Sequence, residues 1–562
     1  MASRTRRYQP FAPLSLSDRS WPDRALEAAP RWLSTDLRDG NQALATPMTP
    51  ERKLAMFDLL VGIGYKEIEV GFPTASQDDH DFVRLLIERD RIPEDVRISV
   101  LVPAREELIE RSARCLAGAR SATLHVYNAT APLFRDVVFR MGRAECKALA
   151  VRGTEWMMRH AERYLGDCDL GYQYSPELFN ETEPEFAVEV CEAVMDTWGV
   201  GPDRPIVLNF PSTVERSLPH VFADQIEWLD RNLSRREHRC LSIHPHNDRG
   251  TGVASAELAV LAGAQRIEGC LFGGGERAGN VCLVTLGLNL YTQGVDPGID
   301  FSDIDRIRRT VEYCTGMPVS ARHPYGGALV YTAFSGSHQD AIRKGFDALA
   351  EQAAAEGRPA DELPWRMPYL PIDPQDVGRD YEAVVRINSQ SGKGGVAYVL
   401  EAWHGLRLPR ELQAEFARAV QLVTDRTGAE LAPGPVRSLF EREYRVGTEL
   451  TGPLAVRREP VTAELFVNGT AGLTEGQVDE LTATLAPWGV EVRAVHGTGA
   501  GAGAPGGEEV GEAAVYARCT FDAGPAWGFG LARDVPAAAF SAVRAAAVRA
   551  GETVAPALSG RD

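Results

Sequence analysis

Short β-rich runs alternate with longer amphipathic stretches over the first 325 residues. Eight units of strand, loop and helix in one series favour a parallel (β/α)8 TIM barrel of the α/β class over an open doubly wound sheet. The helical periodicity is clear in residues 50–63, where Phe57 and Leu60 share one face. The eight runs are Trp32–Asp36, Lys66–Gly71, Arg97–Val102, Ala122–Tyr127, Gly171–Ser175, Ile206–Phe210, Leu241–Pro245 and Arg266–Phe272.

The alternation stops after Pro324, and the remaining pattern predicts mainly helical subdomains with turns at Asp373-Pro374 and Ser391–Gly395. Two similar halves of strand-like and helix-like segments then predict a small α+β domain of regulatory type, interrupted by a mobile loop at Gly497–Gly507. The predicted parts are an N-terminal arm, a catalytic barrel, helical subdomains, a linker and the α+β domain, at residues 1–30, 31–325, 326–450, 451–461 and 462–562.

Composition narrows the class of protein. The 562 residues contain 60 basic and 78 acidic side chains, a net charge of −18, which argues against nucleic acid or an anionic membrane as partner. The nine cysteines form no CxxC pair, as is typical of a reducing compartment. The N-terminus lacks the apolar region of a signal peptide, and no apolar run reaches the ~20 residues of a membrane span. We therefore expect a cytoplasmic protein.

The sequence His244-Pro245-His246 at the end of the seventh run carries the sharpest chemical signal. Residues i and i+2 of a strand point to one side, so both imidazoles can bind one metal ion. A pair of surface histidines would give the same pattern. Asp39, at the end of another run, would complete a mixed nitrogen and oxygen site that suits Mg²⁺ first, and also Mn²⁺ or Zn²⁺. Asn247 and Asp248 are candidates for orienting the histidines.

Further polar residues follow the predicted strands at the end where a barrel builds its site. Arg38 adjoins Asp39, and a guanidinium beside a metal can stabilise the oxyanion that develops on a 2-oxo acid. An ion pair at the barrel rim is the alternative. Gly273–Asn280 is a glycine-rich loop that can hold a ligand, but it lacks the spacing of a dinucleotide fingerprint. The other residues at strand ends are His125, Glu177 and Thr213.

Several segments resemble one family. Ser34–Leu44, STDLRDGNQAL, resembles the signature of the metal-dependent pyruvate-carboxylase-like barrel superfamily, and its LRDGNQ core resembles the 2-isopropylmalate synthases. The segments GYKEIEVGFP, QYSPE, HPHNDRGTGVA, GERAGNVCLVTLGLNL and RHPYGGALVYTAFSGSHQDAI extend the similarity over about residues 10–450. The resemblance implies that acetyl-CoA condenses with 3-methyl-2-oxobutanoate, and that thioester hydrolysis gives (2S)-2-isopropylmalate and CoA, the committed step of leucine biosynthesis.

The resemblance also implies residue roles. The family places metal ligands at Asp39, His244 and His246, with Asn280 close to the ion. It places the 2-oxo acid against Arg38 and Thr213, with Glu177, His125 and Ser175 lining the site. In the homodimer that the family implies, His338 and Tyr369 reach the partner's site, where either could transfer a proton. From the residues alone, Tyr369 would be a packed aromatic side chain at a helix end, and the general base stays open.

Other functions stay open at this point. A citramalate, homocitrate or specialised alkylmalate synthase would share the motifs and use another 2-oxo acid. An inactive relative with a binding or regulatory role would not need Arg38 and the metal motif. The glycine turn of the family's leucine pocket is replaced by Gly472–Gly476, with Glu475 near the expected carboxylate. We expect weak inhibition by leucine or none, unless another turn does the same work in a shifted register.

Overall fold

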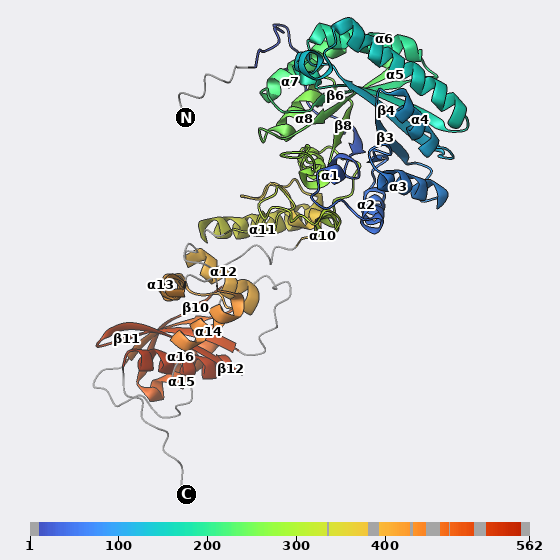
Figure 1. Ribbon diagram of the computed structural model, residues 1–562. Coiled ribbons are helices and arrows are strands. Elements are labelled where there is room, and N and C mark those ends of the chain that lie inside the picture. Colours follow the sequence, from blue (N-terminus) through green and yellow to red (C-terminus); the bar gives the residue numbers. More distant parts are fainter. Residues whose placement is uncertain are drawn as a thin grey trace. The chain divides into compact units, whose positions relative to one another are not determined.

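The computed structural model describes residues 11–333, 336–379, 393–427, 431–445, 461–470, 473–498 and 513–551. The chain divides into two compact units (Figure 1). The first contains Met1–Val330 and Pro374–Arg379, and the second contains Tyr331–Asp373 and Asp380–Asp562.

Eight parallel strands close the first unit into a barrel, because β8 pairs with β1. Each of the eight predicted runs overlaps one strand, so the TIM-barrel prediction is confirmed. The last run is shorter than expected, since β8 ends at Gly269 and a short 3-10 turn covers Leu271–Gly273. The strands are β1 Arg31–Ser34, β2 Glu67–Gly71, β3 Arg97–Pro103, β4 Ser121–Ala129, β5 Asp169–Glu177, β6 Ile206–Ser212, β7 Arg239–Pro245 and β8 Arg266–Gly269.

Helices between the strands form the outer layer of the barrel (Figure 1). In α2, Pro50–Gly62, the Thr49 side chain caps the backbone amide of Arg52, and Phe57 and Leu60 are buried on the predicted face. The barrel unit's helices are α1 Asp39–Gln42, α2, α3 Gln77–Glu88, α4 Glu106–Cys115, α5 Arg143–Tyr164, α6 Pro184–Trp198, α7 Pro219–Asn232, α8 Gly252–Leu261, α9 Leu283–Tyr291 and α10 Ile304–Thr315.

The described part of the N-terminal arm is anchored on α7. Trp21 is buried, and its indole Nε1 donates to Asp224 Oδ1 at 2.8 Å. Glu227 accepts from the backbone amide of Ser20 at 2.9 Å. A single buried aromatic residue and two carboxylates thus fix the arm, while residues 1–10 lie outside the described residues.

The second unit combines helices with a four-stranded sheet in the order β10-β9-β11-β12. Strand β10 runs parallel to β9, and β11 runs antiparallel to both β9 and β12. The elements are α11 Gly336–Glu356, α12 Lys393–His404, α13 Arg410–Thr427, α14 Pro433–Tyr444, β9 Val461–Val467, α15 Glu475–Leu485, β10 Val490–Gly497, β11 Ala513–Phe521, β12 Gly524–Ala532 and α16 Val535–Arg549.

Two predictions for the second unit change. Lys393–Gly395 begin α12 instead of forming a turn, whereas Ser391 and Gly392 lie outside the described residues. The segment around Trp527–Gly530 is an unpredicted strand, β12. Gly528 and Gly530 are required there, because a Cβ at either would lie 2.0 Å from a backbone carbonyl of α16. Of the linker expected over 451–461, Val461 begins β9, and the other residues, like most of the Gly497–Gly507 loop, lie outside the described residues.

The sheet of the second unit has a hydrophobic core on each side. Its inner residues Tyr516, Trp527 and Phe529 share one core with Phe416 and Phe440 of the helices α13 and α14. A second core joins the sheet to α15 and α16 through residues such as Leu465, Leu485 and Val543. The α+β sheet is therefore packed against the preceding helical segment and does not stand alone.

Candidate metal centre and active site

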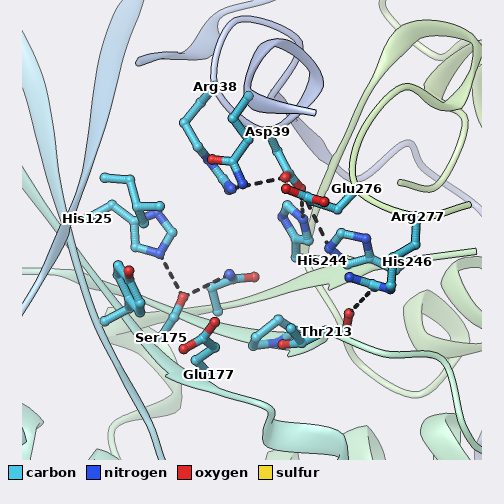
Figure 2. A pocket seen from close by; sticks show the side chains of 15 residues that line it. Arg38, Asp39, His125, Ser175, Glu177, Thr213, His244, His246, Glu276 and Arg277 are labelled. Atoms are coloured by element: carbon cyan, nitrogen blue, oxygen red, sulfur yellow. Dashed lines mark hydrogen bonds and ion pairs between the residues drawn. The ribbon is translucent and has the colours of Figure 1, made fainter. Parts of the chain in front are cut away.

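A polar cavity of about 230 Å³ opens at the C-terminal end of the barrel strands. Figure 2 shows side chains from several strand ends converging on it, as expected of a TIM barrel. It brings together eight of the residues selected from the sequence, which are Arg38, Asp39, His125, Ser175, Glu177, Thr213, His244 and His246.

Asp39, His244 and His246 form the part of the cavity that we call the metal corner. One potential ligand atom from each lies within 4.8 Å of the other two, and all three residues are buried. The Nε2 atoms of His244 and His246 lie 3.2 and 3.6 Å from Asp39 Oδ2. Two imidazoles and a carboxylate suit a divalent cation, so these donors fit the expected metal.

The charged groups of the metal corner shift one another's pKa values. Burial would raise the pKa of Asp39, but Arg38 and His244 hold it well below its usual range. Burial also disfavours a charged His244, yet its hydrogen bonds to Asp39 and Glu268 raise its pKa to about 9. Burial and the neighbouring His244 lower the pKa of His246 to about 3. An anionic carboxylate and a neutral imidazole are thus available as ligands near neutral pH.

Asn280 lies beside the metal corner, because its backbone forms a β-bridge with His246. Its Nδ2 donates to the Gly274 carbonyl at 2.9 Å, while its Oδ1 is buried with no hydrogen-bond partner among the described residues. The tight loop requires Gly279, which has a φ of +87° and whose Cβ would lie 1.8 Å from the Gly273 carbonyl oxygen. A buried amide oxygen without a partner fits the metal-proximal role expected of Asn280.

His125 belongs to a second group, which we call the substrate corner. Its Nδ1 lies 2.7 Å from Glu69 Oε2, and its Nε2 lies 2.7 Å from the Ser175 hydroxyl. Glu69 Oε1 also accepts from Arg38 Nε at 2.5 Å, and Asn209 donates to Ser175 at 2.9 Å. One buried carboxylate therefore orients both the guanidinium and the imidazole that face the cavity.

Glu177 and Thr213 complete the predicted lining. Burial raises the pKa of Glu177, against the opposing effect of Arg38. The Thr213 hydroxyl accepts from the Leu178 amide at 3.0 Å, which leaves its own proton free to be donated. Arg277 donates to the Thr213 carbonyl at 2.5 Å and forms an ion pair with Asp248 at 2.7 Å. The glycine-rich loop thus contributes a second cation to the cavity wall.

Comparison with known proteins gives the family. The HMGL-like family matches residues 29–311, and the family described as alpha-isopropylmalate synthase, post-catalytic domain-like, matches residues 328–401. A 2-isopropylmalate synthase of Streptosporangium roseum is 65% identical over 99% of this chain and 96% of its own length. The corresponding figures are 57%, 97% and 98% for Thermobifida fusca, and 53%, 97% and 97% for Parafrankia sp..

The chain belongs to the 2-isopropylmalate synthase family. It is therefore an enzyme, a transferase of the condensing type. The HMGL-like family depends on divalent metals, and the metal corner is a possible site for one. Among the residues described, none of the helices is long and apolar enough to cross a membrane.

In this 2-isopropylmalate synthase family member, His338 and Tyr369 belong to the second unit. Their rings stack with centroids 3.9 Å apart and planes inclined by 21°. Tyr369 is 61% exposed and has a left-handed φ of 62°, so it is not the packed helix-end aromatic of the alternative interpretation. The structure brings these two residues together, and their part in the reaction stays a prediction.

The sequence analysis missed the residues that orient the site. Asn247 and Asp248, suggested for that role, instead bind the Gly252 amide and Arg277. The residues missed are Glu69 and Gln173, which contact His125, and Glu268, which contacts His244. The available signal was a charged residue at alternate positions of two barrel strands, in Glu67-Ile68-Glu69 and Arg266-Ile267-Glu268.

Proposed function

We propose that this enzyme condenses acetyl-CoA with 3-methyl-2-oxobutanoate and hydrolyses the thioester to (2S)-2-isopropylmalate and CoA. This reaction is the first committed step of leucine biosynthesis. The observation that carries the proposal is the cluster of Asp39, His244 and His246 beside the buried guanidinium of Arg38. The names of the relatives support this reaction, and this cluster would supply the groups that it needs.

Asp39, His244 and His246 would hold the divalent cation, with the Asn280 amide oxygen close to it. Mg²⁺ is the expected ion, with Mn²⁺ and Zn²⁺ also compatible with this donor set. When bound, such a cation supplies Lewis-acid polarisation of the substrate's keto group.

The remaining residues would bind and orient the substrates. Arg38 would donate to the carboxylate of the 2-oxo acid or to the oxyanion that develops, and Glu69 fixes the plane of its guanidinium. Thr213 would donate a second hydrogen bond, and His125 and Ser175 would contact the substrate from the opposite wall. The acetyl group must lose a proton before it attacks, and Glu177, whose raised pKa favours proton uptake, lines the same cavity.

His338 and Tyr369 would act from a partner subunit of a homodimer, where either could take part in proton transfer. Mixing His246→Ala chains with Tyr369→Phe chains, followed by refolding, tests this arrangement. Mixed dimers would contain one site with neither defect and regain part of the activity. Heterodimers that form without regaining activity would contradict the arrangement.

The decisive experiment measures CoA release with acetyl-CoA, a divalent metal and 3-methyl-2-oxobutanoate. A panel including pyruvate and 2-oxoglutarate tests the alternative of a related alkylmalate synthase. The highest kcat/KM for 3-methyl-2-oxobutanoate would support the proposal, whereas a higher kcat/KM for another 2-oxo acid would support the alternative. We also propose that the enzyme works in the cytoplasm, where its nine free cysteines would stay reduced.

A further inference from the structure

We propose that Glu268 is the positioning residue of the metal corner, and that Arg266 holds it in place. The inference rests on the proposed role of His244 as a metal ligand. Neither Glu268 nor Arg266 lines the cavity, and both lie inside the barrel on β8. They would act on the cation through the orientation of one imidazole.

The hydrogen bond between Glu268 and His244 selects the ligand atom of the imidazole. Glu268 Oε2 lies 3.0 Å from His244 Nδ1, while His244 Nε2 faces Asp39 Oδ2 at 3.2 Å. An ionised carboxylate only accepts hydrogen bonds, so when the cation displaces one proton from His244, the proton that remains stays on Nδ1. The lone pair of Nε2 then points toward Asp39, where the cation would lie.

Glu268 is itself immobilised by several donors. Its Oε1 accepts from Arg266 at 2.6 Å, Gln173 at 2.7 Å and Ser242 at 3.1 Å. Arg266 is 1% exposed, and it also donates to Gln173, Ser242 and Glu67 at 2.6, 3.0 and 2.7 Å. Because three donors fix Oε1, they also fix the position of Oε2. The hydrogen bond from Oε2 then sets the plane of the His244 ring.

The other imidazole has no comparable support. His246 Nδ1 is buried and has no hydrogen-bond partner among the described residues. His246 is fixed through its backbone instead, since its amide donates to the Ser212 carbonyl at 3.2 Å. The orientation of the His244 ring relative to His246 therefore depends on the Glu268 carboxylate. Replacing Glu268 should weaken cation binding even where the barrel stays folded.

Glu67 provides a matched control for the experiment. Like Glu268, it is a carboxylate that forms an ion pair with Arg266, at 2.7 Å. Among the described residues, its side chain contacts Arg31 and Arg266 and none of the proposed metal ligands. Glu67→Gln and Glu268→Gln each remove one negative charge from the same arginine, but only the second alters the support of His244.

The experiment measures binding of Mn²⁺ alone to the metal-free full-length chain, by the loss of the free-ion electron paramagnetic resonance signal. We expect Glu268→Gln to raise the Kd for Mn²⁺ by roughly 10- to 100-fold, as loss of such a partner does in other metal sites. Glu67→Gln should change it by less than about threefold. Equal losses in the two variants, or no loss in Glu268→Gln, would overturn the proposal.

A second variant separates positioning from folding. Glu268→Gln leaves Arg266 buried with one carboxylate fewer, which can destabilise the barrel. The double variant Arg266→Met with Glu268→Gln also removes the buried arginine that has lost one of its two carboxylate partners, so its thermal midpoint should recover toward that of the original chain. Its Mn²⁺ affinity should stay low, because nothing restores the carboxylate beneath His244. Recovery of affinity together with stability would show that the role was only structural.

The outcomes distinguish this inference from the proposed function. If the original chain binds Mn²⁺ and releases CoA from the proposed substrates, unchanged binding by Glu268→Gln overturns only the positioning role. If the chain binds Mn²⁺ with the expected loss in Glu268→Gln but releases no CoA, the proposed function fails and the positioning role is supported.

Discussion

The metal corner and the substrate corner use the same arrangement of side chains around an imidazole. His244 and His125 each direct Nδ1 at a buried glutamate, which is Glu268 in one and Glu69 in the other. In both glutamates, the second carboxylate oxygen accepts from an arginine. In each corner the contacts run from an arginine through a glutamate to an imidazole, and the two corners differ in which end of this series faces the cavity.

In the substrate corner, Arg38 lines the cavity, and the far nitrogen of the imidazole meets the hydroxyl of Ser175 (Figure 2). In the metal corner, Arg266 lies out of the cavity, and the far nitrogen meets the carboxylate of Asp39. One arrangement would thus present a cationic hydrogen-bond donor to the substrate, whereas the other would present a ring nitrogen to the cation. The same arrangement of arginine, glutamate and imidazole would thus serve two chemical purposes, depending on whether the arginine also lines the cavity.

The largest effect should come from removing a metal ligand. His246→Ala deletes one of two imidazoles and should lower condensation by at least about 1,000-fold, since a Lewis acid contributes several kcal/mol to the transition state. CoA release by the chelated and re-metallated variant measures the effect. His220→Ala, at an exposed position of α7, is the control and should remain active. Near-normal release by His246→Ala would remove the basis for a metal corner.

Arg38→Lys should have the next largest effect, in the substrate corner. Loss of one such donor typically costs roughly 10²- to 10³-fold in kcat. Lysine keeps the charge but cannot reproduce the planar fork that contacts both Glu69 and the cavity. Steady-state kinetics should show the loss, while the Kd for Mn²⁺ stays close to that of the original chain. Full activity in the lysine variant would contradict the assigned role.

Glu69→Gln tests whether the two corners are separable. It removes a charged partner from both Arg38 and His125, and a lost hydrogen bond to a charged group corresponds to about 10- to 100-fold in kcat/KM for the 2-oxo acid. Mn²⁺ binding should be unaffected, which is the reverse of the result expected for Glu268→Gln. A parallel loss of metal affinity would mean that the corners form a single network.

Asp36 shows what happens to a buried carboxylate without an arginine. Burial raises its pKa to about 7, against the opposing hydrogen bonds from Leu271 and Ser34, whereas Arg266 keeps the pKa of Glu268 far below its usual range despite burial. A raised pKa means that the folded state holds the proton more tightly, so Asp36 should lower stability as pH rises from about 4 to about 7. Asp36→Asn should flatten this part of the dependence of the thermal midpoint on pH. An identical slope in the two proteins would contradict the shift.

Leucine inhibition should give the smallest effect and involves neither corner. Thr474 and Gln477 form a capping box at the start of α15, so the described residues of the segment expected to replace the family's glycine turn begin a helix. Glu475 at the first helical position is exposed, and its negative charge would lie near the position expected for the carboxylate of leucine. Initial rates at saturating substrates should change by less than about twofold with millimolar leucine.

The control for leucine is Glu475→Gln in the full-length chain, which removes the charge and keeps the helix. Truncation after Arg458 is less suitable, because it would expose the core that α13 and α14 share with the sheet. Strong inhibition of the original chain at sub-millimolar leucine would show that the pocket survives in a shifted register.

Much of the barrel and of the cavity lining could be predicted, because both follow from local patterns. Strand spacing located all eight strands, and the i, i+2 geometry of His244 and His246 is a property of one strand. Glu69 and Glu268 were missed because their contacts join different strands, such as the one between Glu268 and Gln173 across the barrel. Charged residues inside barrel strands can be recognised by alternation, but their partners depend on how the barrel closes.

The second unit was harder to predict for a different reason. Strand β12 contains Gly528 and Gly530, which weaken a strand on local propensity and are needed only because α16 lies against them. Likewise, Gly394 and Gly395 have poor helix propensity but lie in the first turn of α12, whose Val396, Val399 and Leu400 enter a buried core. In both places, tertiary packing overrides the local preference of the chain.

The core shared by the C-terminal sheet and the helices before it limits where this chain can be joined to part of a relative in a chimaeric protein. Exchange of residues 461–551 alone would place new side chains at positions 516 and 529, now Tyr516 and Phe529, against the original Phe440. Their rings lie 5.2 to 6.4 Å apart where they meet Phe440, too close for independent drift. A C-terminal domain taken from a relative would therefore have to be exchanged together with its own α12 to α14. The unit that can be exchanged is thus larger than the domain predicted from the sequence.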